Sequence, residues 1–455
     1  MKLSFHGATD EVTGSCMLLE VADAGGKTHR VLIDCGMFQG ERMCGTKNLQ
    51  PFGFDAKTIE TVFVTHPHAD HTGRLPKLIK EGYTGKIIMT RPGLALTRLV
   101  LDDAFHIMEE NSRRCGDALL YTKEDLDDLI PRCQGIGYHE AIDVAPGIRV
   151  MFHDAGHVLG SAYISIDAEG KRIVFSGDIG NDNVPILPPT EPLSHADVVI
   201  CESTYGNRVH EGREERTRKL RDAIEKSIAR GGVLMIPAFS IERTQELLFE
   251  INQLLSNELK TNALMFLDSP MAIRATEVYR EFSDYLRFDA DVLKQKGQDF
   301  FSFPNLRETL TVDESKAIND APSPKVIIAG SGMMSGGRIM HHLQRYLPDA
   351  KNMLLVIGYQ GAGTLGRTIY NGAKEVTIYG TKVQVKAEIQ AIGAFSAHGD
   401  QTKLTRWLTP TEGPVPKKIL LTHGDADAKP VFADHLREVL KTEVVIPVAG
   451  QVYDL

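Results

Sequence analysis

Three imidazoles and one carboxylate fall within six residues of this chain, in the segment His66-Pro67-His68-Ala69-Asp70-His71. A β-branched and aromatic run at 61–65 precedes the segment and predicts a buried strand. The cluster is therefore expected at the carboxyl end of a strand, where layered α/β proteins build their sites. Zinc prefers nitrogen and carboxylate ligands, so one tight loop could direct His66 and His68 to one metal ion and Asp70 and His71 to a second.

An isolated histidine is more often an ordinary surface or core residue than a metal ligand. For His106, which lies alone on a helix predicted at 92–114, we favour that interpretation. It does not suit the segment at 66–71, because the 16 histidines of a 455-residue chain would rarely fall in this pattern by chance. The segment therefore predicts a metal site.

Two further loops carry potential ligands after apolar runs. His157 follows Gly156, a residue type that permits close backbone approach, and we favour it as a ligand over the nearby His153. Asp178 follows the strand predicted at 172–175, where a lone aspartate could simply cap a turn. The residues alone do not decide whether Asp178 is a metal ligand or caps a turn.

An aspartate, a glutamate and two histidines stand at comparable positions, each at a strand end or before a predicted helix. The aspartate, Asp34, precedes a cysteine and a glycine, so it could be an ordinary turn residue. The glutamate, Glu202, ends the strand predicted at 198–201. One histidine, His423, ends the strand predicted at 419–422. The four residues are Asp34, Glu202, His398 and His423.

The pattern H-x-H-x-D-H at 66–71 resembles the signature of the metallo-β-lactamase superfamily. Other stretches resemble the motifs of its β-CASP branch, namely an acidic strand end (Glu202), P-A-F-S-I-E-R-T-Q-E-L (237–247), D-S-P-M-A, G-T-L-G-R, S-A-H-G-D and T-H-G-D. The likeness covers essentially the whole chain. The branch comprises nucleic-acid nucleases, and the chain is similar to a compact prokaryotic form of the mRNA 3′-end cleavage factors.

This resemblance implies an α/β fold, a four-layer αββα metallo-β-lactamase domain with an inserted α/β β-CASP domain. The sequence agrees with an insertion, because about 190 residues separate the Glu202 region from the next candidate ligand. That distance is too long for a loop, and strand and helix patterns alternate within it. We expect the first domain in two parts, 1–205 and 391–455, with the inserted domain at 206–390.

The resemblance also implies two zinc ions per chain. Mapped by motif, one ion takes two histidines of the central segment and a third from a later loop, and the other ion takes the remaining ligands. The ligand sets are His66, His68 and His157 for the first ion, and Asp70, His71 and His423 for the second, with Asp178 as the bridge. His68 stands where a di-iron branch of the superfamily would carry glutamate, which favours zinc; manganese or iron are alternatives.

The implied reaction is hydrolysis of a phosphodiester by a hydroxide shared between the two metal ions. His398 is expected to be the general acid that protonates the leaving 3′-oxygen, while Glu202 orients its ring and raises its pKa. For Asp34 we favour a position behind the metal site, where it orients a ligand or a metal-bound water. The products would carry a 5′-phosphate and a 3′-hydroxyl.

The expected substrate is single-stranded RNA, because a site between two domains is too narrow for a duplex. The expected cleavage is internal. Several alternatives stay open: a 5′ exonuclease, a DNA nuclease, a small-molecule ester or thioester hydrolase, or a non-catalytic RNA-binding subunit. The inserted domain and His398 argue against a small-molecule hydrolase. The complete ligand set argues against a non-catalytic subunit.

A Gly/Ser-rich turn at 330–338 follows one predicted strand and could cradle phosphate with its backbone N–H groups. It lacks the G-K-[ST] ending of a P-loop, and tight packing alone could also explain it. For the arginines expected to bind phosphate, the alternative is a surface salt bridge. The candidates for phosphate contacts are Arg243, Ser331, Ser335 and Arg367.

The composition is that of an ordinary globular chain, 42% hydrophobic and 24% charged. The six cysteines form no C-x-x-C pair, which favours reduced thiols and a cytoplasmic protein. No apolar run predicts a membrane span, and the start lacks the pattern of a signal peptide. The net charge of −9 is unlike that of a typical nucleic-acid binder, although a basic channel can lie within an acidic total. A homodimer stays open.

Overall fold

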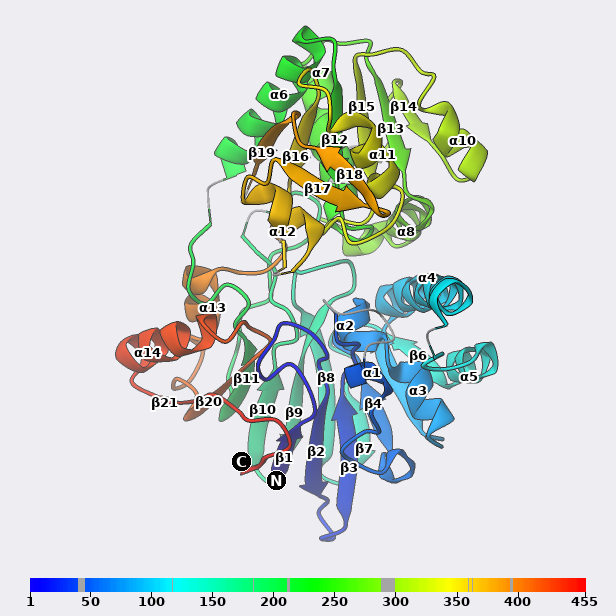
Figure 1. Cartoon of the computed structure of the whole chain (residues 1–455). Helices are drawn as coiled ribbons and strands as arrows, with labels where there is room; N and C mark the ends of the chain where they lie inside the picture. Colours follow the sequence, from blue (N-terminus) through cyan, green and yellow to red (C-terminus); the bar gives the residue numbers. More distant parts are fainter. Residues whose placement is uncertain are drawn as a thin grey trace. The chain divides into compact units, whose positions relative to one another are not determined.

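A computed structural model describes residues 1–39, 46–116, 118–182, 184–210, 213–287, 299–358, 360–361, 363–392 and 396–455. The chain divides into two compact units (Figure 1). The first comprises Met1–Asp182, Leu187–Val209 and His398–Leu455, and the second comprises Asn183–Ile186 and His210–Ala397. The domain boundaries expected from the sequence, at 205/206 and 390/391, stay a proposal.

Two sheets form the centre of the first unit, each with seven strands among the described residues. The first sheet has the order β22 (Val452–Asp454), β1 (Lys2–Phe5), β2 (Met17–Ala22), β3 (Thr28–Ile33), β4 (Thr61–Phe63), β5 (Lys86–Thr90), β6 (Cys133–Ile136). The second has the order β21 (Glu443–Val445), β20 (Lys418–Thr422), β11 (Val198–Glu202), β10 (Lys171–Phe175), β9 (Ala162–Ala168), β8 (Ile148–Asp154), β7 (Ile142–Ala145).

The two sheets pack face to face, and helices cover their outer faces. Apolar side chains of both sheets, including Phe63, Phe152 and Phe175, form the core between them. A second core lies between the first sheet and its helices, and a third lies between the second sheet and its helices. The helices are α1 (Thr46–Leu49), α2 (Ala69–Thr72), α3 (Leu75–Lys80), α4 (Arg91–Cys115) and α5 (Lys123–Leu129) with the first sheet, and α13 (Gln401–Trp407) and α14 (Ala428–Leu440) with the second. The αββα layering expected from the sequence is therefore present.

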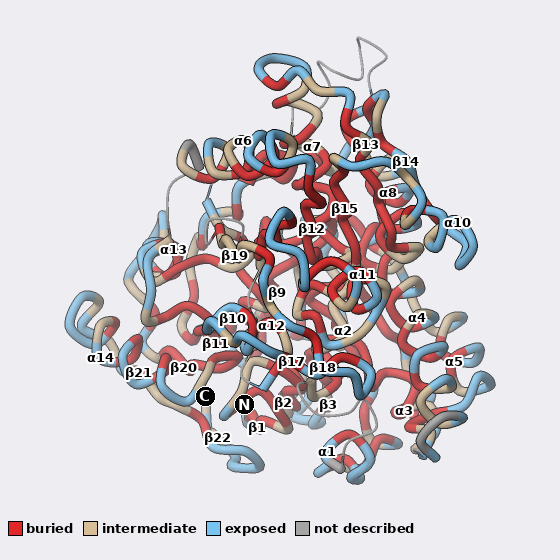
Figure 2. Tube along the Cα trace, turned by 45° about the horizontal axis from the view of Figure 1, so that its top comes forward, coloured by how far each residue is buried: buried red, intermediate tan, exposed pale blue. Residues whose placement is uncertain are grey.

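The strands form where the sequence supplies short apolar and β-branched runs, and Figure 2 shows their interiors largely buried. Within the first sheet β3 and β4 are parallel, and within the second β10, β11 and β20 are parallel. Parallel strands end at the same edge of a sheet. The polar residues that follow these strands are thereby gathered at one place.

The second unit is built on a sheet of six parallel strands among its described residues. The strand order is β14 (Leu306–Glu308), β13 (Leu264–Asp268), β15 (Lys325–Ala329), β12 (Val233–Pro237), β16 (Met353–Val356), β19 (Glu388–Ala391). Residues of both alternations, such as Met235 and Leu234, are fully buried, so both faces are covered. Around the sheet lie α6 (Arg213–Ala229), α7 (Arg243–Asn257), α8 (Pro270–Glu281), α10 (Val312–Ala317), α11 (Ile339–Tyr346), α12 (Leu365–Tyr370) and the hairpin β17 (Glu375–Ile378)–β18 (Thr381–Gln384).

Helix α7 begins two residues later than its apolar pattern suggests. The pattern predicts a helix over 241–255, but Glu242 has a φ of 66°, which a right-handed helix does not allow. The helix therefore starts at Arg243 and runs to Asn257. Its buried face includes Leu247, Leu248 and Ile251, as the pattern predicts.

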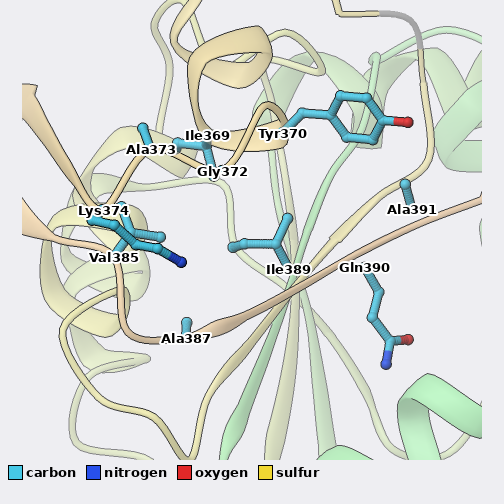
Figure 3. Close-up of a pocket in the computed structure, with 10 residues that line it drawn as sticks. All are labelled: Ile369, Tyr370, Gly372, Ala373, Lys374, Val385, Ala387, Ile389, Gln390 and Ala391. Carbon is cyan, nitrogen blue, oxygen red and sulfur yellow. The ribbon is translucent and has the colours of Figure 1, made fainter.

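A cavity of about 350 Å³ lies in the second unit beside α12 and β19 (Figure 3). Its lining combines apolar side chains with the polar Lys374 and Gln390. Among the described residues that line it are none of the predicted phosphate contacts. In the described parts of the chain, no helix has both the length and the apolar character that crossing a membrane requires.

Candidate active site

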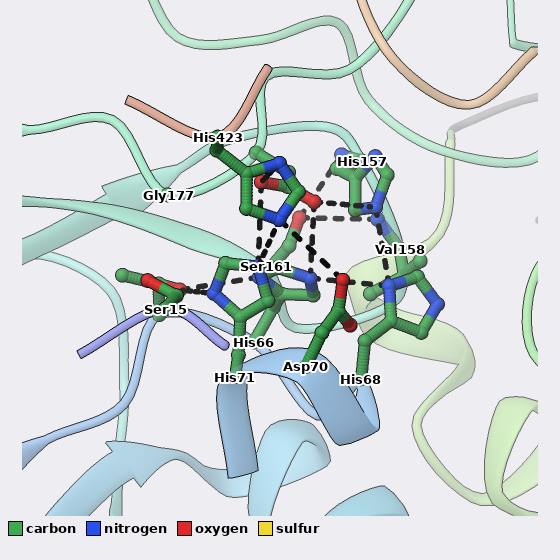
Figure 4. Close-up of polar contacts among 12 residues, drawn as sticks. Ser15, His66, His68, Asp70, His71, His157, Val158, Ser161, Gly177 and His423 are labelled. Carbon is green, nitrogen blue, oxygen red and sulfur yellow. Dashed lines mark hydrogen bonds and ion pairs between the residues drawn. The ribbon is translucent and has the colours of Figure 1, made fainter. Parts of the chain in front are cut away.

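The central histidine segment lies where the sequence predicts it, directly after β4. His66, His68, Asp70 and His71 occupy the loop and the short helix α2, and their side chains converge with those of His157 and His423 (Figure 4). The loop turns tightly against the end of β3, where a Cβ on Gly36 would lie 1.5 Å from the carbonyl oxygen of Asp70. Glycine at position 36 is therefore required for this close approach.

Four ligand atoms form the first group. His66 Nε2 lies 3.1 Å from His68 Nδ1 and 3.4 Å from Asp178 Oδ2. His157 Nε2 lies 3.3 Å from His68 Nδ1 and 3.6 Å from Asp178 Oδ2. Three imidazoles from two distant segments and one carboxylate thus enclose a common point.

The second group uses the other oxygen of the same aspartate. His71 Nε2 lies 3.1 Å from His423 Nε2, which lies 3.4 Å from Asp70 Oδ2. Asp178 Oδ1 is 3.5 Å from His71 Nε2. The two carboxylate oxygens of Asp178 therefore face the two groups separately, as a bridging ligand requires.

These distances fit a pair of metal sites. Ligand nitrogens about 2.0–2.1 Å from a tetrahedral zinc ion lie about 3.3–3.4 Å from one another, which matches the separations in both groups. Within the described residues, Asp178 Oδ1 is buried and accepts no hydrogen bond. Such an atom is costly to bury unless a cation compensates it, so the donor set fits divalent metal ions.

Burial and neighbouring charges set the protonation of the cluster. Burial, together with the like charges of the surrounding histidines, lowers the pKa of His66 well below its usual value and leaves a lone pair for a metal. Burial also lowers the pKa of His71, but the carboxylates of Asp178 and Asp34 outweigh it and raise that pKa to about 10. Metal binding at His71 must therefore displace a proton.

Asp34 lies behind the cluster rather than in it. Its Oδ2 accepts a hydrogen bond from His71 Nδ1 at 2.7 Å, which leaves Nε2 of that ring to face the metal site. The carboxylate also accepts hydrogen bonds from the backbone N–H and hydroxyl of Thr65 and from the hydroxyl of Ser15. Asp34 is completely buried at a φ of 60°, a conformation that aspartate and asparagine tolerate better than most residues.

We expect Asp34→Asn to weaken metal binding by about 10- to 100-fold, the usual cost of losing a partner that orients a ligand. Asparagine keeps the size and tolerates the backbone angle, so the change isolates the lost charge. A zinc titration against a competing chelator measures the affinity. Ser15→Ala, which removes one hydrogen bond to the same carboxylate, should cost less, and equal affinities of Asp34→Asn and wild type would rule out the orienting role.

Glu202 and His398 meet beside the metal cluster although 196 positions separate them in sequence. His398 Nδ1 donates to Glu202 Oε2 at 3.1 Å and lies 3.7 Å from Asp178 Oδ2. The Ile179 N–H donates to Glu202 Oε1 at 2.6 Å, which fixes the carboxylate. Burial lowers the pKa of His398, but Glu202 and Asp178 outweigh it and raise that pKa to about 9, so the ring is protonated at neutral pH.

The candidates for phosphate contacts all lie in the second unit. Ser331 and Ser335 belong to the turn after β15, where the Ser335 N–H donates to Ser331 Oγ, and Arg367 lies half-buried on α12. Arg243 differs, because its side chain is only 4% exposed and pairs with Glu246. That burial also suits a structural role for Arg243, and its contact with phosphate stays a prediction.

Sequence reasoning missed two threonines that support the site. Thr65 hydrogen-bonds Asp34 and approaches the Nδ1 atoms of His66 and His71 at 3.1 and 3.4 Å. Thr204 Oγ1 lies 3.3 Å from His423 Nδ1. The only signal in the sequence was that both hydroxyl residues stand next to the ends of site-bearing strands. Phe395, next to the S-A-H-G-D motif, and Cys44 lie outside the described residues.

Comparison with known proteins adds three family matches along the chain. A model described as "Metallo-beta-lactamase superfamily" matches residues 9–226, and "Beta-Casp domain" matches 244–369. A model described as "Zn-dependent metallo-hydrolase RNA specificity domain" matches 382–447. Together these matches include every residue of the two groups of potential metal ligands.

Two relatives align over nearly the whole chain. "Ribonuclease TTHA0252" of Thermus thermophilus is 37% identical, over 94% of this chain and 94% of its own. "Transcription termination factor FttA" of Methanocaldococcus jannaschii is 31% identical, over 98% of this chain and 70% of its own. A crystal structure of a protein of unknown function from Enterococcus faecalis superposes with a TM-score of 0.56 at 12% identity, covering 100% of this chain and 99% of that one, which shows a shared fold alone.

Proposed function

The chain belongs to the metallo-β-lactamase superfamily and carries its β-Casp domain, and from this premise we propose that it is a metal-dependent ribonuclease that cleaves single-stranded RNA. Membership makes the chain a metal-dependent hydrolase. The observation that carries the proposal is the double ligand cluster sharing Asp178, with the Glu202–His398 pair beside it. A match to an RNA specificity domain and a relative named a ribonuclease support RNA as the substrate.

We propose that zinc occupies both groups. His66, His68 and His157 would hold one ion, and Asp70, His71 and His423 the other, with Asp178 between them. When bound, two such ions supply Lewis-acid activation of water and charge neutralisation at the phosphate. The all-nitrogen and carboxylate donor set suits zinc, and manganese or iron are the alternatives that metal analysis must exclude.

The chain's own residues supply the proton for the leaving group. With His398 Nδ1 bound to Glu202, its Nε2–H is the proton offered to the 3′-oxygen of the departing strand. Asp34 keeps His71 oriented with Nε2 toward the metal site. We propose that the products carry a 5′-phosphate and a 3′-hydroxyl and that cleavage is internal.

A single assay tests this function. Single-stranded RNA labelled at its 5′ end is incubated with protein of measured metal content, beside DNA of the same sequence. We expect internal RNA fragments ending in 3′-hydroxyls; a lone labelled mononucleotide would indicate a 5′ exonuclease instead. If fully metallated protein leaves RNA intact but hydrolyses DNA or a thioester, the ribonuclease proposal is wrong.

We expect Glu202→Gln to lower the pH at which cleavage declines on the alkaline side. His398 must be protonated to act, so wild-type activity should fall as the pH rises past the pKa of His398. Glu202 raises the pKa of His398, and its neutral replacement therefore moves this fall toward neutral pH. Single-turnover rates from pH 6 to 10 measure the effect. An unchanged alkaline limb would contradict the proposed link between Glu202 and the acid.

We expect Arg367→Ala to flatten the salt dependence of RNA binding. Each phosphate contact to a single strand contributes a slope of about 0.7 in log affinity against log salt, so one lost contact should reduce the slope by that amount. Binding is measured in the His398→Ala background, which prevents cleavage. Arg218→Ala is the matched control, because Arg218 pairs with Glu215 and Asp222 on α6. An unchanged slope in Arg367→Ala would show that Arg367 does not contact phosphate. Ser331 and Ser335 would then remain as the proposed phosphate contacts.

Two further proposals concern the protein's setting. The free thiols of Cys16, Cys35, Cys133 and Cys201 support a cytoplasmic location. The homodimer left open by the sequence stays a prediction, which light scattering at several protein concentrations would test.

A further inference from the structure

A separate group of potential ligands lies in the first unit outside the proposed catalytic cluster. It comprises His139 in the loop between β6 and β7, His153 on β8, and Glu191 in the segment before β11. We infer that these three residues form an additional binding site for a divalent transition-metal ion. The inference is independent of the ribonuclease proposal.

The geometry places one imidazole at each oxygen of a single carboxylate. His153 Nδ1 lies 3.1 Å from Glu191 Oε1, and His139 Nε2 lies 3.3 Å from Glu191 Oε2. One potential ligand atom from each residue lies within 4.8 Å of the other two. These separations resemble those within the two catalytic groups, where ligand atoms surround a common point.

The ring of His153 is fixed in a way that suits a ligand. It stacks on Tyr163, its cross-strand neighbour on β9, with ring centroids 4.6 Å apart and planes within 9°. Its Nε2 lies 2.9 Å from Ser165 Oγ. When Nε2–H donates to this hydroxyl, Nδ1 carries the lone pair and faces Glu191, which is the tautomer that metal binding needs.

The backbone of His139 is held in an uncommon conformation that brings its ring to the same place. Its φ is 62°, in the left-handed region, and its N–H donates to the carbonyl oxygen of Phe152 at 2.9 Å. The side chain is 58% exposed, so packing of the ring does not explain the conformation. Such a conformation persists where the surrounding structure holds it, and here the hydrogen bond to Phe152 keeps His139 in place.

Glu191 is also fixed through its backbone. Its N–H donates to the carbonyl oxygen of Asp154, and its own carbonyl accepts a hydrogen bond from Trp407 Nε1 at 3.2 Å. Three separate segments of the first unit thus hold three potential metal ligands close together. An ordinary ion pair with Glu191 needs one histidine, whereas a metal ion would bind both His139 and His153.

The donor set selects the class of cation. Two imidazoles and one carboxylate suit zinc and its first-row neighbours, while magnesium and calcium prefer sets made of oxygen alone. Three protein ligands leave one tetrahedral position for water. The ion would tie the loop at 137–140 and the segment around Glu191 to β8.

Zinc binding to matched variants of the full chain tests the site. Wild type, His139→Ala, Glu191→Gln and His195→Ala are stripped with a chelator and dialysed against the same free zinc concentration, and zinc per chain is counted. His195→Ala is the control, since it removes a partly exposed histidine that pairs only loosely with Asp197 at 3.9 Å. We expect His139→Ala and Glu191→Gln to hold one zinc ion fewer per chain than wild type and the control.

A cobalt titration provides a second readout on the same proteins. Wild type should show one more equivalent of visible absorption change than His139→Ala. Cleavage of RNA should differ between these two proteins by less than about twofold, since neither His139 nor Glu191 contacts the proposed catalytic ligands. Equal zinc content and equal cobalt titrations of wild type and both variants would overturn the site, whatever their activity.

Discussion

A His398→Ala variant is expected to cleave single-stranded RNA about 10²- to 10⁴-fold more slowly than wild type, the usual contribution of a positioned general acid. Without the imidazole, the departing 3′-oxygen must leave as an alkoxide or take a proton from water. Metal content should not change, because His398 approaches Asp178 no closer than 3.7 Å and its Nδ1 is bound to Glu202. Single-turnover cleavage of 5′-labelled RNA and a metal count on the same preparation measure both quantities.

The control for this experiment is His106→Ala, which removes an exposed histidine from α4. It should retain full activity and metal content. If His398→Ala cuts RNA at the wild-type rate with its metals intact, another group or water donates the proton and Glu202 loses its proposed task. If His398→Ala loses metal as well as activity, His398 is a ligand rather than an acid, and the assignment must change.

The sequence predicted the site elements that depend on local pattern. The segment at 66–71 follows β4, and Asp178, Glu202 and His423 stand at strand ends as expected. This works because β-branched runs and turn residues determine short strands locally, and parallel strands then deliver their carboxyl ends to one edge. Buried strands such as β11 (Val198–Glu202) and long helices such as α4 were predicted to within a residue or two for the same reason.

The residues alone could not predict which side chains, distant in sequence, come together in the fold. The pairing of Glu202 with His398 closes a separation of 196 positions, and only the family's motifs suggested it beforehand. The cluster of His139, His153 and Glu191 belongs to no such motif, and no sequence pattern joins these three residues. The packing of the sheets brings such distant residues together, and that packing cannot be deduced from the types of single residues.

Burial also bears on the prediction for Arg243, which stays a prediction. Arg243 stands in a motif shared with nucleases and was predicted to contact phosphate, yet it pairs with Glu246, and the neighbouring Arg216 pairs with Glu246 and Glu250 in the same buried network. A sequence shows that an arginine has acidic neighbours on a helix but not that the whole network is enclosed. Buried arginine is stable only with such partners, so its charge is already compensated.

Asp178→Asn should have the other large effect, because one carboxylate serves both groups of ligands. Its Oδ2 lies 3.4 Å from His66 Nε2 and its Oδ1 lies 3.5 Å from His71 Nε2. The amide that replaces it is uncharged, and one of the two oxygens becomes an NH₂ group that cannot bind a metal. We expect at least one metal ion per chain to be lost and cleavage to fall by more than the roughly 10- to 100-fold typical of a residue that only orients a ligand.

The metal count separates a bridging role from a merely electrostatic one. Asp182→Asn is the matched control, since that carboxylate lies at the surface and pairs with Lys403 and Arg406. It should keep both metal and activity. In Asp178→Asn, excess zinc should restore part of the metal content but little of the cleavage, because the neutral residue cannot hold two ions at their shared position. Full metal content with full activity would show that Asp178 does not bridge, and the two groups would then have to act as separate sites.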